Sequence, residues 1–117
     1  FVVSAAGVRN NKVGLLLYSV SGRNAASFQG GTLCVQPQIK RTPGVSSART
    51  PAPALACSGV YAIDMNAFAA GLAGGNPIAA LSVTGTVVDA QWWGRDQGFP
   101  APNNTTLSDA VEWVVQP

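Results

Sequence analysis

The chain contains no histidine and few charged residues. Without imidazole, Ser-His-Asp and Cys-His catalytic arrangements are excluded, as is a general base of the histidine type. Seven residues are basic and five acidic, 10% of the chain, whereas a typical soluble domain has about 25%. Two interpretations of so neutral a surface remain open. It belongs either to an extracellular domain with a neutral polar coat or to a subunit whose surface largely meets other subunits.

Long apolar runs are also missing, so the sequence predicts no membrane span. The length of 117 residues suits one domain, and 47% hydrophobic residues are enough for a core without a metal or cofactor. We therefore expect a single extracellular domain over residues 1–117 that needs no cofactor. The absence of a start methionine and of a basic-then-apolar leader fits a mature secreted product or an excised module.

Other catalytic motifs are lacking as well. The glycines near residue 74 lack the lysine and the strand–turn–helix context of a phosphate loop. Asp89 and Glu112 are expected in the middle of strands, where acids usually face solvent, so a glycosidase-type pair is not favoured. The sequence therefore indicates that the protein is not an enzyme.

The few charges are sorted along the chain. Residues 1–58 carry basic side chains and no acid, and residues 59–117 carry five acids and Arg95. The net charge of +2 is too small to indicate a nucleic-acid partner. The two halves either neutralise each other within one fold or favour head-to-tail association of copies.

Two cysteines, Cys34 and Cys57, are too few for a zinc site and are not spaced as a redox motif. We therefore predict a disulfide between them, which implies an oxidising compartment. It would restrain residues 40–58, a stretch rich in proline and serine. The alternative is two buried free thiols.

Alternation of apolar and polar residues predicts several short strands, and one helix is predicted at 67–72, capped by Asp64 or Asn66. The predicted strands cover residues 12–20, 32–40, 59–65, 84–93 and 109–115. This pattern is typical of an all-β protein, an antiparallel β-sandwich or jelly-roll-like fold with one short helix and one disulfide.

The N-terminal segment 1–9 begins with an apolar, uncharged run that includes Phe1, Val2 and Val3. Such a segment either forms an edge strand of its own domain or adds to the sheet of a neighbouring copy. These three residues are therefore candidate interface residues.

Aromatic residues are the candidate ligand platform. Trp92 and Trp93 are consecutive in a predicted strand and must point to opposite faces, so one belongs to the core. The other packs against a second layer, lies under a loop or at an interface, or stacks on a sugar with Trp113 or Tyr18 beside it.

The loop after Trp93 offers a few oxygen ligands. Asp96, Asn103, Asn104 and Asp109 are candidates for calcium, although such residues more often satisfy turn hydrogen bonds. Asn103 and Asn104 also begin overlapping glycosylation sequons. Arg95 and Asp96 are predicted to hold the start of this loop.

Four stretches together resemble a C-terminal module of large secreted proteins from planctomycete-type bacteria. They are NKVGLLLYSVSG, FQGGTLCVQPQIKRTPG, CSGVYAIDMNAFAAG and GTVVDAQWWGRDQGFPAPNNTTLSDAVEW. The resemblance covers residues 10–115, with one departure at Gln97, where the family pattern has proline. It supports the disulfide and the extracellular setting and implies no activity or catalytic residue.

These observations lead to one functional expectation and one alternative. We expect a non-enzymatic structural subunit, extracellular or at the cell surface, that binds copies of itself in a filament or surface layer. The alternative is an adhesive or carbohydrate-binding module that uses exposed tryptophans, with a polysaccharide as partner.

Overall fold

The computed structural model describes residues 1–117, which form mostly antiparallel β-structure with one short α-helix. The strands are β1 (Val2–Val8), β2 (Val13–Ser19), β3 (Arg23–Phe28), β4 (Gly31–Val35), β5 (Lys40–Arg41), β6 (Val45–Ser46), β7 (Gly59–Asp64), β8 (Val87–Arg95) and β9 (Thr105–Val114). The helix α1 (Met65–Ala69) follows β7, and a 3-10 turn η1 (Ala79–Ser82) precedes β8.

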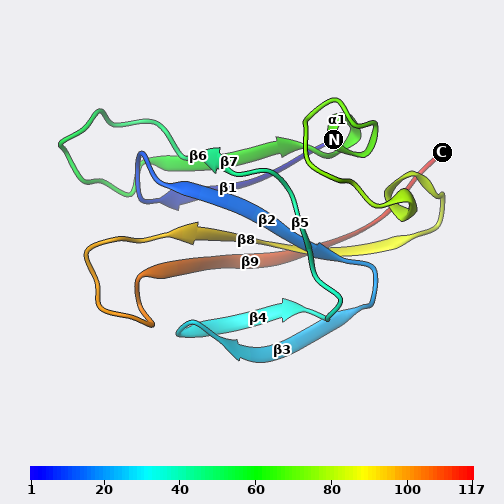
Figure 1. The fold of residues 1–117 in the computed structure, drawn as a ribbon, viewed down its shortest axis with the longest axis horizontal. Helices are drawn as coiled ribbons and strands as arrows, with labels where there is room; N and C mark the ends of the chain where they lie inside the picture. Colours follow the sequence, from blue (N-terminus) through cyan, green and yellow to red (C-terminus); the bar gives the residue numbers. More distant parts are fainter.

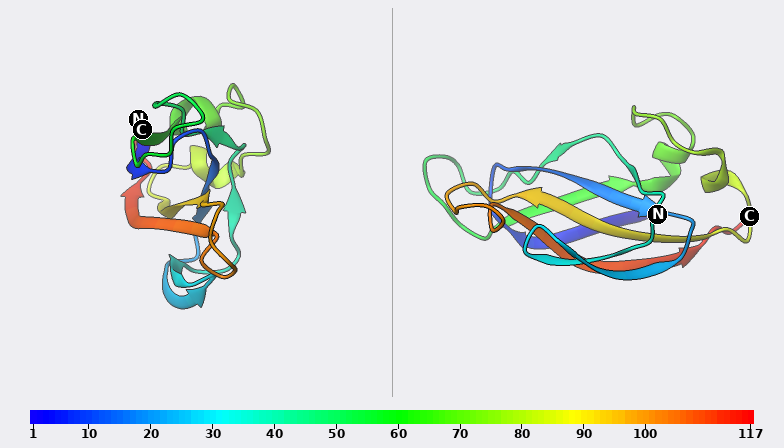
Figure 2. Two further views of the ribbon diagram at one scale, coloured as in Figure 1. Left: turned by 90° about the vertical axis from the view of Figure 1, so that its left-hand side faces the viewer. Right: turned by 60° about the horizontal axis from the view of Figure 1, so that its bottom comes forward.

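The strands are arranged in three sheets (Figure 1). The central sheet has the order β5-β2-β8-β9, and β6 also pairs with β2. Strands β1 and β7 form a pair above it, and the β3–β4 hairpin lies below it in the same view. The views in Figure 2 show the same arrangement from an end and from below. Both faces of the central sheet are therefore covered.

The apolar core lies between the central sheet and the β1–β7 pair. Eleven buried residues form one cluster there: Val3, Leu16, Tyr18, Tyr61, Ile63, Met65, Phe68, Leu81, Val88, Ala90 and Trp92. Tyr61 stacks on Trp92 with ring centroids 5.3 Å apart, and Tyr18 meets Phe68 edge to face at 5.9 Å. This layer is held mainly by burial of apolar and aromatic surface.

Two glycines make room for Tyr61 in this core. Gly14 and Gly94 are cross-strand partners in β2 and β8. A Cβ atom at Gly14 would lie 2.5 Å from Cζ of Tyr61, and one at Gly94 would lie 2.6 Å from its hydroxyl oxygen. The tyrosine ring therefore packs directly against the backbone of the central sheet, which only glycine permits at these two positions.

The helix is capped by Asp64, one of its two predicted caps. It starts two residues earlier than the predicted range 67–72 and is shorter. The carboxylate of Asp64 accepts hydrogen bonds from the backbone N–H groups of Asn66 and Ala67, at 2.9 and 3.2 Å. Met65 and Phe68 then point into the core. No helix in the structure is long and apolar enough to cross a bilayer.

The predicted disulfide is wrong, because Cys34 and Cys57 are not bonded to each other. Cys34 lies in β4, below the central sheet, whereas Cys57 lies in the loop that leads into β7, above it. The sheet thus separates the two residues, a consequence of the three-layer arrangement that sequence spacing did not indicate. The thiols are not buried as a pair either, since Cys57 is exposed and Cys34 is half-buried.

Other strand predictions were partly right. The strand expected at 32–40 ends at Val35 and resumes as β5, and no strand was predicted at the position of β3. The strand expected at 109–115 begins four residues earlier, at Thr105. The segment Val2–Val8 pairs with β7 of its own chain, so it is an edge strand of this domain.

Candidate functional site

The side chain of Gln91 joins the hairpin to the central sheet. Its amide oxygen accepts the backbone N–H of Cys34 at 3.0 Å. Its amide nitrogen donates to the backbone oxygens of Thr32 at 3.1 Å and Ser108 at 2.6 Å. Gln91 is only 3% exposed, so one buried amide binds three main-chain groups of β4 and β9.

An ion pair forms the second connection to the hairpin. Arg23, at the start of β3, binds Glu112 of β9 through two nitrogens, at 2.8 and 2.7 Å. This bidentate arrangement is the geometry that guanidinium and carboxylate groups favour. The hydrogen bonds from Arg23 lower the pKa of Glu112.

Asp89 lies beside this ion pair as the direct cross-strand neighbour of Glu112. It is 3% exposed, and its Oδ2 atom has no hydrogen-bond partner. Burial raises the pKa of Asp89 above its ordinary value, and the neighbouring Glu112 raises it further. The expectation that Asp89 faces solvent is therefore wrong, because the hairpin covers that face of the sheet.

A polar hollow of about 470 Å³ lies between the tip of the hairpin and β9. Near it, the side-chain oxygen of Gln29 accepts hydrogen bonds from the indole nitrogen of Trp93 at 2.8 Å and from the hydroxyl of Thr105 at 2.9 Å. Thr32, Asn103 and other amide and hydroxyl residues line the hollow. These amide and hydroxyl groups, together with the carboxylate of Asp109 in the same lining, are chemically suited to hydroxyl-rich ligands.

A second groove, of about 430 Å³, separates β1 from β9. Its lining includes Tyr61 and Trp92 from the core, and neither the Tyr61 hydroxyl nor the indole N–H of Trp92 has a hydrogen-bond partner. Strands β1 and β9 are each the last strand of their sheet, so their outer edges are unpaired. The groove is thus bordered by two free strand edges.

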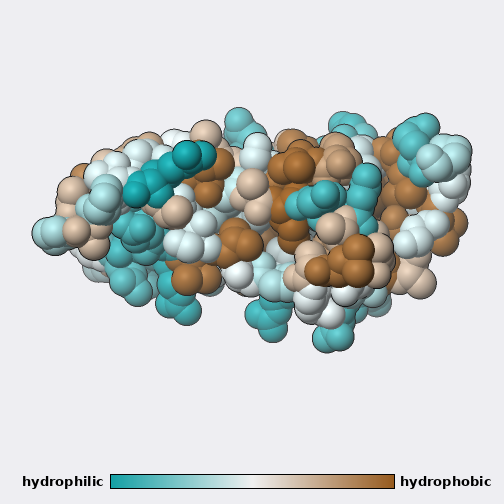
Figure 3. All heavy atoms as spheres, turned by 90° about the horizontal axis from the view of Figure 1, so that it is seen from above, coloured by the Kyte–Doolittle hydropathy of each residue, from teal (hydrophilic) through white to brown (hydrophobic).

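Exposed apolar side chains occur on several elements of the surface. On β9, Val111 and Val114 are 44% and 45% exposed, and Val2 of β1 is also exposed. Figure 3 shows the face above β7 and α1, where hydrophobic residues are interspersed with hydrophilic ones and gather over the half that carries α1.

The four residues of the predicted aromatic platform are not all accessible. Tyr18 and Trp92 are buried in the core and offer no face to a ligand, so they are removed from the platform. Trp93 and Trp113 are half-buried. The guanidinium of Arg95 lies over the ring of Trp93, 5.9 Å from the ring centroid. Trp113 contacts the ring of Phe1 edge to face, with the two ring centroids 5.2 Å apart. The two half-buried tryptophans are therefore not neighbours in one platform.

The three predicted interface residues also differ in exposure. Phe1 and Val2 are more than half exposed, whereas Val3 is buried and belongs to the core. Of the three, only the first two have side chains that a partner can contact.

The candidate calcium ligands are dispersed around the loop 96–104. The backbone N–H of Asp96 donates to the oxygen of Asn104 at 2.9 Å, and the Asp96 carboxylate lies 3.7 Å from Nε of Arg9. The side-chain oxygen of Asn103 lies against Gly30 of the hairpin, and Asp109 belongs to β9. No three acidic or cysteine side chains cluster closely enough to hold a metal ion. The contacts of Asp96 fit its predicted role of holding the loop.

The residues that connect the layers were not singled out from the sequence. Gln91 and Asp89 alternate with the apolar residues of β8, which is the ordinary pattern of a strand with one solvated face. The one available signal was the missed strand β3, because a second layer on that face would have buried both side chains. Compared with models of protein families, with curated proteins and with solved structures, the chain matches none of them.

Proposed function

We propose that this protein is a non-enzymatic structural subunit that self-associates into a filament or layer outside the cell. The observation that carries the proposal is the pair of open edges on β1 and β9. These strands have 7 and 10 residues and contain no lysine or proline, the residues that commonly protect exposed edges. Their unpaired backbone groups are available to another copy of the chain.

The scarcity of charge supports the same proposal. A surface with few charges has little to oppose close contact between like copies, and net charge keeps many proteins monomeric. Exposed Val111 and Val114 add apolar surface beside the free edge of β9. Self-association would cover both features.

The absence of catalysis is also part of the proposal. The one pair of adjacent carboxyl groups, Asp89 and Glu112, lies under the hairpin, and Arg23 occupies the exposed side of Glu112. This arrangement is suited to holding two layers together, and it leaves no room for a substrate between the carboxyl groups.

The finer fold assignment and the setting outside the cell are also parts of the proposal. We propose an antiparallel β-sandwich formed by the β1–β7 pair and the central sheet, with the hairpin as a third layer. The extracellular setting, and membership of the planctomycete-type module, rest on the sequence resemblance and the neutral composition. The unbonded cysteines remove the support that a disulfide would have given.

The mass of the untagged protein in solution tests the proposal. Sedimentation equilibrium should show a mass that rises with concentration, and negative-stain microscopy should show filaments or sheets at the upper end of the range. A chain that stays monomeric up to its solubility limit would exclude self-association as its function.

A carbohydrate-binding role is the second candidate, and the polar hollow near Trp93 favours it. Amide and hydroxyl groups in such a hollow match the hydroxyl groups of a sugar, and the adjacent indole offers a stacking surface. Binding of soluble polysaccharides to wild-type protein and to Gln29→Ala, measured by calorimetry, tests this role. A monomeric protein whose polysaccharide binding is lost in this variant would replace the first proposal with the second.

A further inference from the structure

The two edges of the central sheet carry opposite charges. Lys40 and Arg41 of β5 are exposed at one edge, and neither belongs to an ion pair within the chain. Asp109 and Glu112 lie on β9 at the other edge, and the Asp109 carboxylate has no ion-pair partner either. Figure 2 shows β5 and β9 on opposite sides of the molecule when it is viewed from its end.

The charges also lie in the same rows across the sheet. One row of cross-strand partners runs from β5 to β9 and consists of Lys40, Tyr18, Ala90 and Val111. In the next row Arg41 is connected through Leu17 and Gln91 to Ala110. The basic pair at one edge is therefore level with residues 110–111 at the other. Asp109 and Glu112 flank those residues on either side.

The directions of the strands allow the two edges to meet. Each pairing in the order β5-β2-β8-β9 is antiparallel, so β9 and β5 run in opposite directions. A second copy placed beside the first in the same orientation would therefore set its β5 antiparallel to β9 of the first. Such a neighbour continues the alternation of strand directions without inverting the molecule.

We propose that copies of this chain associate head to tail, with the β9 edge of one copy beside the β5 edge of the next. The contact brings Asp109 of one copy to Lys40 of the next, on the same face of the sheet, while Glu112 stays bound to Arg23 of its own copy. Pairing of β9 with β9 would instead place acids opposite acids, which is unfavourable. This inference rests on the proposed function and names the surface that performs it.

The contact joins two different surfaces, so it does not close on itself unless the rotation between copies closes a ring. The twist of a sheet rotates each strand relative to its neighbour by about 20–25°. Successive copies are therefore rotated about the direction of growth, and the expected product is a twisted filament.

Charge reversal at the two edges tests the inference. Lys40→Glu and Asp109→Lys should each weaken association about three- to tenfold at low salt, because each replaces an attraction with a repulsion. The double variant Lys40→Glu/Asp109→Lys should recover the wild-type association constant, since the exchanged charges again face each other. Association of the wild type should weaken as salt is raised.

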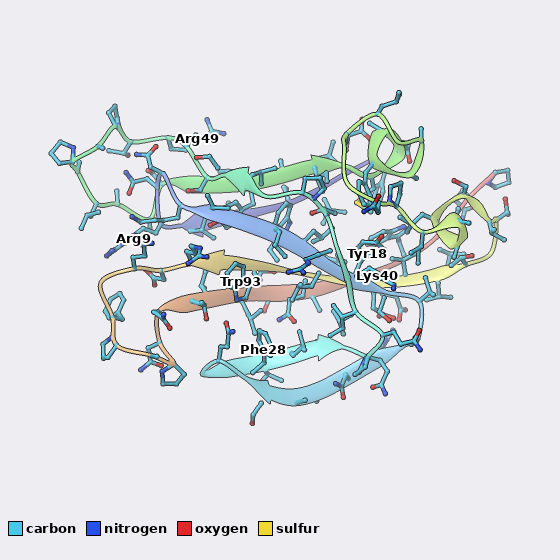
Figure 4. The ribbon with its side chains drawn as sticks, in the orientation of Figure 1. Arg9, Tyr18, Phe28, Lys40, Arg49 and Trp93 are labelled. Carbon is cyan, nitrogen blue, oxygen red and sulfur yellow. The ribbon has the colours of Figure 1, made fainter.

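Arg49→Glu is the matched control. Arg49 is an exposed arginine in the loop before β7, away from the β5 edge where Lys40 lies (Figure 4), and the substitution makes the same change in charge. It should leave the association constant unchanged. Circular dichroism of each variant checks that the fold is intact.

The outcomes separate this inference from the proposed function. If the wild type associates but Lys40→Glu and Asp109→Lys behave like Arg49→Glu, the edges of the central sheet are not the interface, and the copies associate through another surface. If the double variant remains as weak as the single ones, the two charges do not face each other. If the wild type is monomeric, the proposed function itself fails.

Discussion

The two faces of the central sheet are covered in different ways. On the side of β1 and β7, apolar residues of β2 and β8 pack against Tyr61, Ile63 and Phe68 without a hydrogen bond between their side chains. On the side of the hairpin, Gln91 of β8 and the ion pair between Arg23 and β9 make the principal polar contacts. One strand therefore supplies an apolar interface to one layer and a polar interface to the other.

This difference predicts unequal strength for the two layers. Burial of large apolar side chains contributes about 1.5–3 kcal/mol each, whereas a typical hydrogen bond contributes about 0.5–1.5 kcal/mol. Eleven residues form the apolar cluster, whereas the hairpin buries only Leu33 and Val35 as large apolar side chains, besides its one amide and one ion pair. The hairpin should therefore be the first layer to open.

Loss of the Tyr61 ring should have the largest effect on stability. Tyr61→Ala removes a side chain that is 1% exposed and that stacks on Trp92, so the free energy of unfolding should fall by about 3–5 kcal/mol. Gly14→Ala should cost about 1–3 kcal/mol, because its Cβ would overlap the same ring. Urea denaturation followed by tryptophan fluorescence measures both changes.

The double variant tests the stated cause. In a Tyr61→Ala background the space above Gly14 is empty, so Gly14→Ala should be neutral or stabilise by about 0.5–1 kcal/mol. An equal cost of Gly14→Ala in both backgrounds would mean that the glycine is needed for a reason other than the ring of Tyr61.

Loss of the Gln91 amide should have a smaller effect, concentrated in the hairpin. Gln91→Met keeps the length of the side chain but leaves the N–H of Cys34 and the oxygens of Thr32 and Ser108 without partners. The free energy of unfolding should fall by about 2–3 kcal/mol. Hydrogen exchange should accelerate most in β3 and β4, with little change in β1 and β7 at conditions where the protein stays folded.

Gln91→Glu serves as the graded control. The introduced carboxylate can still accept the hydrogen bond from Cys34, but both donated hydrogen bonds are lost. The backbone amide hydrogens of the hairpin should therefore exchange at least as fast in this variant as in the wild type. Uniform acceleration of exchange over the whole molecule in Gln91→Met would contradict the view that the hairpin opens separately.

Sequence patterns predicted the parts of the fold that depend on local chemistry. The alternation of Leu16 and Tyr18 predicted β2, and the side chain of Asp64 predicted the start of α1. The hairpin could not be predicted in this way, because β3 has little apolar alternation and is held in place by residues more than 60 positions away.

The candidate site was predicted less well than the fold. Which tryptophan is buried depends on which face of β8 meets the larger layer, and spacing alone does not decide this. The error over Cys34 and Cys57 has the same origin, since sequence separation did not reveal the sheet between them. Both the burial of one tryptophan and the separation of the two cysteines therefore depend on how the layers stack, which local sequence patterns do not reveal.

Neutralisation of Asp89 should have the smallest effect, and it should stabilise the protein. The raised pKa of Asp89 means that folding disfavours its charged form, chiefly through burial. Asp89→Asn removes this charge, so the free energy of unfolding at pH 7 should rise by about 1 kcal/mol if the amide occupies the same space. Asp109→Asn, at an exposed position on β9, is the matched control and should leave stability unchanged.

The gain should depend on pH with a definite sign. The folded protein holds the Asp89 proton more tightly than the unfolded chain does. The wild type therefore loses stability as pH rises from the unfolded value of about 3.9 through the raised pKa of Asp89. The advantage of Asp89→Asn should thus be complete above that pKa and vanish as pH falls toward about 4. The lowered pKa of Glu112 acts in the opposite direction, removing stability at low pH, but its largest cause, the hydrogen bonds from Arg23, is common to wild type and variant. Thermal unfolding of both proteins from acidic to neutral pH measures the difference, and an advantage that grows toward low pH would show that burial does not hold Asp89 protonated.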